Sequence, residues 1–176
     1  RRGETVCAQN DRPMYPEDPV PPLPALQLSL CQNLERRLVG LPRERVFAAV
    51  ERIEIATAEI SPDGMLPADF IAFRVMGEAV PLAADSSMSV IDAGTAIADM
   101  SALAERLTAA AGLTLTDRFA AGLLTAEQLC SRWNISRKTL DRLRKRGLVG
   151  RRIMLEDGKA RIGFSPRVVE GFQVRH

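Results

Sequence analysis

The feature that most limits how this chain can fold is segment 125–172, where helix and turn signals divide a strongly basic sequence. From Thr125 onward there are 13 Lys/Arg and 5 Asp/Glu, a formal charge of +8, whereas residues 1–124 carry 11 and 17, a formal charge of −6. The whole-chain charge of +2 conceals this division. Positive charge confined to one part of a chain indicates a polyanionic partner for that part.

The segment opens with the signals of a short helix and a sharp turn. Thr125 and Gln128 have the spacing of a capping box. In such a box the threonine hydroxyl accepts from the glutamine backbone amide, and the glutamine side chain reaches back to the threonine backbone amide. The first helix is expected to end near Trp133. Asn134 follows, and asparagine tolerates the left-handed backbone that a tight turn requires.

A second helix is predicted over residues 137–146. Ser136 precedes it as a cap and Gly147 follows it as a stop. Leu140 and Leu143 lie on the side expected to be buried. The sequence therefore predicts two helices joined by a tight turn.

A β-hairpin and a last short helix complete the segment. Residues 149–155 and 160–164 suit strands, and Asp-Gly at 157–158 is a strong signal for a two-residue turn. Ser-Pro at 165–166 combines a cap with a first-turn proline. The order helix, turn, helix, hairpin, helix is that of a winged helix-turn-helix, a fold that places its second helix in the major groove of DNA.

Cations on the second helix and on the hairpin are the candidate DNA contacts. Four cations of the helix are expected in the major groove, where arginine can pair with guanine: Arg137, Lys138, Arg142 and Lys145. Arg146 and the cations that follow it are expected to meet mostly phosphates. Asp141 lies among them and would be repelled by phosphates, accept from a cytosine amine, or pair with a neighbouring cation. The full candidate set is Arg137, Lys138, Thr139, Arg142, Lys145, Arg146, Arg151, Arg152, Lys159 and Arg161.

The first 25 residues contain six of the eleven prolines and are predicted to be an extended tail. Residues 26–116 are predicted to form an acidic helical domain, and residues 123–174 the DNA-binding domain. Helices are expected from Ala25 to 38, from Pro42, from Pro67 with Phe70 and Phe73 among its apolar positions, and from Val90 to 111. A loop is expected at 77–88. The fold class is therefore mainly α, with one small hairpin.

The acidic residues of this helical domain are expected on solvent-facing positions; examples are Glu51, Glu54, Asp92 and Asp99. Cys7, Cys31 and Cys130 are too few and too widely spaced for a disulfide framework. The single histidine argues against a zinc site. We expect no enzyme activity, no cofactor, no membrane span and a cytoplasmic location, since no catalytic pattern, apolar span or targeting signal is present.

The segment LLTAEQLCSRWNISRKTLDRLRKRGLVGRRI, with GKARIGFSPRVVEGF after it, resembles the MerR/excisionase type of winged helix-turn-helix over about 50 residues. The order of a proline-containing tail, an Ala/Leu-rich helical region and this module also resembles the N-terminal extension of certain bacterial RNA polymerase sigma factors. The resemblance implies sequence-specific DNA binding in transcription initiation or regulation. MerR-type regulators carry the module first in the chain, whereas here it comes last.

Two other functions fit the same residues. One is a protein-interaction module that docks on RNA polymerase, and the other is an excisionase-like accessory factor of recombination. The expected partner is double-stranded DNA, with RNA polymerase as a second partner, and homodimerisation is one route to specific affinity.

Overall fold

The computed structural model describes residues 22–82 and 89–175, so most of the predicted tail and part of the predicted 77–88 loop lie outside the described residues. The fold is mainly helical, with one two-stranded and one three-stranded sheet. The elements are α1 (Ser29–Val39), α2 (Arg43–Glu59), β1 (Met65–Pro67), α3 (Ala68–Met76), β2 (Val90–Asp92), α5 (Ala93–Ala110), the 3-10 turn η1 (Arg118–Ala120), β3 (Leu124–Thr125), α6 (Ala126–Trp133), α7 (Arg137–Lys145), β4 (Arg151–Met154), β5 (Ala160–Phe164) and α8 (Pro166–Arg175).

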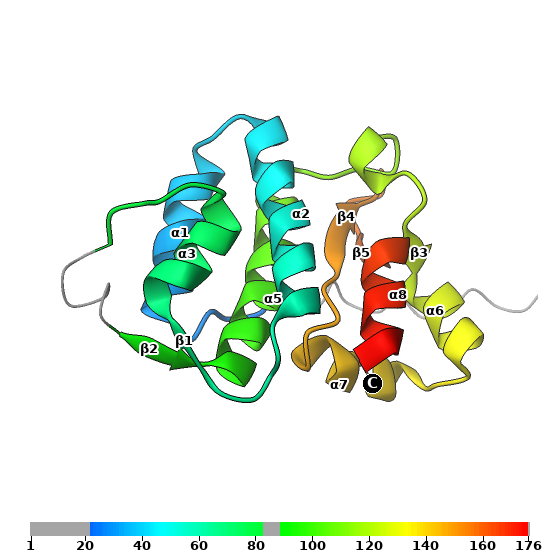
Figure 1. Cartoon of the computed structure of the whole chain (residues 1–176). Helices are drawn as coiled ribbons and strands as arrows, with labels where there is room; N and C mark the ends of the chain where they lie inside the picture. The colour runs from blue at the N-terminus through cyan, green and yellow to red at the C-terminus, as the bar shows by residue number, and fades with distance from the viewer. Residues whose placement is uncertain (1–21, 83–88, 176) are drawn as a thin grey trace, which may run out of the picture.

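Helices α2 and α5 form the centre of the molecule (Figure 1). Helices α1 and α3 pack on one side of this pair, and β4, β5 and α8 lie on the other. The apolar stripe of α2 that the sequence predicts is buried, as Val46, Ala49, Val50 and Ile53 show. Burial of this stripe supplies the hydrophobic stabilisation that holds α2 against its neighbours.

The first helix begins at Ser29, four residues later than expected. The backbone amides of Gln27 and Leu28 donate to the two carboxylate oxygens of Asp99, at 2.9 and 3.0 Å. These bonds hold the preceding chain extended against α5 and satisfy a buried carboxylate. Asp99 is 3% exposed, so the expectation that it faces solvent is wrong.

The region around Val90 is also different from the prediction, because a strand precedes the long helix. Val90 pairs with Pro67 and Asp92 pairs with Met65 in an antiparallel ribbon. Helix α5 then begins after Asp92, which stays exposed as expected, and whose side chain accepts from the Thr95 backbone amide at 2.8 Å. Phe70 and Phe73 of α3 are exposed rather than buried.

The C-terminal elements have the predicted order: α6, a tight turn, α7, a hairpin and α8. The hairpin strands β4 and β5 pair antiparallel from Arg151↔Gly163 to Met154↔Ala160, and β3 adds a third strand beside β5.

One hydrophobic cluster runs through both predicted domains, from Leu30 of α1 to Phe172 of α8. A smaller cluster joins Phe47 of α2 to Ile153 of β4. Apolar contacts therefore cross the expected boundary between residues 116 and 123, and the C-terminal elements share a core with α2 and α5.

Candidate nucleic-acid interface

The turn between α6 and α7 is built by local hydrogen bonds. The Gln128 amide donates to the Thr125 hydroxyl at 3.2 Å, and the Thr125 amide donates to the Gln128 side chain at 2.8 Å, which completes the predicted capping box. Asn134 adopts the left-handed conformation with φ 51°, as expected. The Ile135 amide then returns to the Cys130 carbonyl at 3.0 Å. These bonds fix the angle at which α7 leaves the turn.

Ser136 caps α7, since its hydroxyl accepts from the Thr139 amide at 3.2 Å. The Thr139 hydroxyl lies 3.0 Å from the same oxygen, so this candidate DNA contact already has a partner inside the turn. The helix stops at Gly147, whose φ of 101° is a conformation that residues with a side chain rarely adopt. Leu140 is buried and Leu143 is half-buried, which confirms the predicted inner side of α7.

The outer side of α7 presents a basic stripe, which we define as Lys138, Arg142 and Lys145. The three are exposed, and their spacing of four and three residues places them on one face of the helix. No carboxylate of residues 22–82 or 89–174 forms a salt bridge with any of them. Asp141 lies on the same face and approaches Arg144 at 3.6 Å, which is a weak contact.

Two further cations lie near Glu127 of α6. Arg137 lies 3.1 Å from Glu127 of α6, and both side chains are exposed. The pKa of Glu127 is lowered: burial opposes the shift, and hydrogen bonds from the backbone and Thr125, with the charges of Arg137 and Arg161, outweigh it. Arg161 of β5 is exposed. Glu127 is therefore influenced by one cation of α7 and one of the hairpin.

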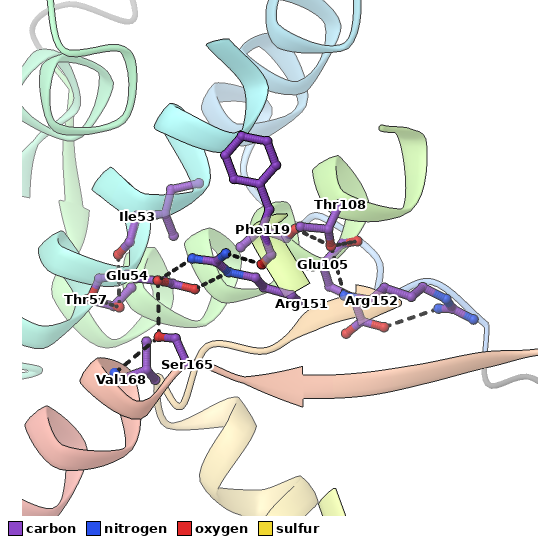
Figure 2. Close-up of polar contacts among 11 residues, drawn as sticks. Ile53, Glu54, Thr57, Glu105, Thr108, Phe119, Arg151, Arg152, Ser165 and Val168 are labelled. Atoms are coloured by element: carbon purple, nitrogen blue, oxygen red, sulfur yellow. Dashed lines mark hydrogen bonds and ion pairs between the residues drawn. The ribbon is translucent and has the colours of Figure 1, made fainter. Parts of the chain in front are cut away.

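Arg151 and Arg152 are not part of this face, and their predicted contact with phosphates is wrong. They are 6% and 4% exposed. Arg151 donates to both oxygens of Glu54 at 2.7 and 2.9 Å and to the Phe119 carbonyl at 2.8 Å (Figure 2). Glu54 is 5% exposed, so the expectation that it faces solvent is also wrong. A charge in this interior requires a partner, and each of these ions provides one for the other.

Arg152 of β4 also pairs with a buried carboxylate, which belongs to α5. Its guanidinium donates to Glu105 at 3.1 Å, and its backbone amide donates to the Thr108 hydroxyl at 2.8 Å. Glu105 is 3% exposed and also pairs with Arg144 of α7. Sequence reasoning missed Glu105 and Arg144. In the sequence, Glu105 stands beside the apolar positions Ala104 and Leu107, which indicates that it lies near the core. This position does not identify its partner.

The hairpin tip carries both signs of charge. Gly158 has a φ of 78°, as the Asp-Gly turn predicts. The Lys159 ammonium lies 3.7 Å from Asp157, and its backbone amide donates to the same carboxyl group at 3.0 Å. Glu156 is exposed beside them. Lys159 is therefore a weaker candidate for a phosphate contact than the cations of the basic stripe.

The described part of the chain contains no group of three or more His, Cys, Asp or Glu residues placed to hold a metal ion. No helix of the described residues has the length and apolarity needed to cross a membrane.

The chain was compared with protein-family models, with curated proteins and with solved structures, and none of them matches.

Proposed function

We propose that residues 123–174 form a winged helix-turn-helix that binds duplex DNA, with α7 as the reading helix in the major groove. The observation that carries this proposal is the basic stripe on a capped and exposed helix. Like charges on neighbouring turns repel one another, and phosphates or guanine edges would relieve that repulsion. The resemblance to sigma-factor extensions supports a role in transcription initiation or regulation, in the cytoplasm.

The burial of Arg151 and Arg152 makes the proposed DNA-binding surface smaller. The exposed candidates that remain are the basic stripe together with Arg137, Arg146 and Arg161. Six phosphate contacts predict that the logarithm of the binding constant falls with the logarithm of salt concentration with a slope of about −5. A larger slope would require cations from a second copy of the chain or from a further DNA-binding element.

The test is a salt titration of the full chain on fluorescent duplex DNA, followed by anisotropy. Lys145→Gln should lower the magnitude of the slope by about 0.9, because one phosphate contact is lost. Arg36→Gln is the matched control, since it removes the same charge from an exposed position on α1. A wild-type affinity that does not change with salt, or an equal effect of both variants, would contradict the proposal.

A second candidate function is docking of this module on RNA polymerase. Asp141 on the outer face of α7 and the exposed Glu156 at the hairpin tip favour it, because phosphates repel both groups. The reversal Arg142→Glu with Lys145→Glu separates the two functions. If the module docks on RNA polymerase, this double variant is no longer retained on core RNA polymerase. Neither the variant nor the wild type then binds duplex DNA above background.

A further inference from the structure

Glu105 of α5 joins two elements of the proposed DNA-binding module. One of its carboxylate oxygens accepts from Arg152 of β4 at 3.1 Å, and the other is bound by Arg144 of α7. The carboxylate is 3% exposed. One buried group on a helix of the acidic region thus contacts both the reading helix and the first strand of the hairpin.

The chain between α7 and β4 lies directly on α5. A side chain at Gly147 would place its Cβ 2.5 Å from Ile97 of α5, so the backbone and the helix are in close contact there. One turn beyond Glu105, Thr108 accepts from the Arg152 backbone amide at 2.8 Å. These contacts fix where the hairpin begins relative to α5.

The turn fixes the start of α7, and few buried residues hold the rest of the helix. The helix is nine residues long, and Leu140 is its single fully buried residue. A helix of this length is marginal without tertiary contacts. Arg144 follows Leu140 by one turn, so its pairing with Glu105 fixes the rotation of the helix about its axis, and with it the direction of the basic stripe.

Glu54 provides a second buried carboxylate that makes no such contact. It pairs with Arg151 of β4 and accepts from the Ser165 hydroxyl at 3.3 Å. Both carboxylates attach the acidic region to the hairpin, and Glu105 also holds α7. This difference makes Glu54 a control for the role of Glu105.

We propose that Glu105 is a positioning residue for DNA reading, and that α5 serves as the support that orients α7 relative to the hairpin. The inference rests on the proposed function. It assigns the acidic helical region a role in DNA recognition, although all the candidate DNA contacts lie between residues 137 and 161.

The experiment compares wild type, Glu105→Gln and Glu54→Gln as full chains. Duplexes are first selected from a random library with the wild type, and each variant is then measured on the selected duplex and on a scrambled duplex of equal length. Glu105→Gln should lower the ratio of the two affinities about tenfold, the discrimination of one good base contact. Its binding to the scrambled duplex should persist, because the basic stripe keeps its charge.

A purely stabilising role predicts a different result. Partial unfolding lowers both affinities by the same factor and leaves their ratio unchanged, which is the expected result for Glu54→Gln. If Glu105→Gln does not fold, as judged by circular dichroism, Arg144→Gln provides the second test, because it releases α7 and leaves the Glu105–Arg152 pair in place. An unchanged ratio in the folded variant overturns the inference alone. The absence of any duplex binding by the wild type would refute the proposed function as well.

Discussion

Replacement of Arg151 by methionine removes the guanidinium from a buried ion pair and keeps most of the side-chain volume. Glu54 would then retain the Ser165 hydroxyl, 3.3 Å away, as its remaining side-chain donor. The Phe119 carbonyl would also lose its 2.8 Å bond. Breaking a buried pair by removal of one partner costs about 3–5 kcal/mol, because the other charge stays buried. That is a large part of the roughly 5–15 kcal/mol by which domains are stable.

Urea denaturation followed by circular dichroism measures this cost. With a slope of about 2 kcal/mol per molar urea, a loss of about 4 kcal/mol lowers the midpoint by about 2 M. Arg142→Met, on the exposed face of α7, is the matched control and should change stability by less than about 0.5 kcal/mol. The double variant Arg151→Met with Glu54→Leu removes both charges and should recover most of the loss.

The same two variants can also show that Arg151 is not buried. If Arg151→Met changes the urea midpoint no more than Arg142→Met does, and instead lowers the salt slope of duplex binding, Arg151 faces DNA. Such a result would mean that Arg151 is not buried against Glu54 and contacts phosphates, as the sequence predicts.

Three further predictions concern single positions. Gly147→Ala should destabilise the fold by about 2–4 kcal/mol in urea denaturation, because it combines a strained backbone with a clash against Ile97; Gly158→Ala, which has a similar φ and open space, should cost less. A hydrogen bond from the Arg43 guanidinium, together with one from the Thr114 amide, lowers the pKa of Asp117 from 3.8 to about 2. Its contribution to stability is therefore complete above about pH 4 and is lost as the pH falls toward 2. In acid unfolding curves, Asp117→Asn should make the free energy of unfolding depend less on pH in that range. Asp141→Asn should tighten binding to scrambled duplex DNA in anisotropy assays, since it removes a charge that phosphates repel; weaker binding would mean that Asp141 accepts a hydrogen bond from a base.

Local signals in the sequence predicted the C-terminal elements well. The Thr125 capping box, the left-handed Asn134 and the Ser136 cap depend on residues no more than five apart, so a single stretch of sequence contains both partners. The same holds for the hairpin turn at Gly158. In each case the backbone conformation follows from hydrogen bonds or steric freedom that the local residues provide.

The errors concern interactions between distant residues. Glu54 and Arg151 are 97 positions apart, and Glu105 and Arg152 are 47 apart. Nothing near Arg151 distinguishes a buried arginine from one that binds phosphate, because the residue type and the strand are the same in both cases. The strand at Val90 was missed for a similar reason, since its partner is Pro67. Pairing of this kind depends on the tertiary arrangement.

The buried carboxylates also affect how this protein folds during synthesis. Glu54 and Glu105 leave the ribosome before the arginines that neutralise them, since translation proceeds from the N-terminus. Until Arg151 and Arg152 emerge, both carboxylates lack the partners that neutralise them in the folded chain and stay in water. The surface of α2 and α5 that carries them is therefore covered only after the hairpin has been made.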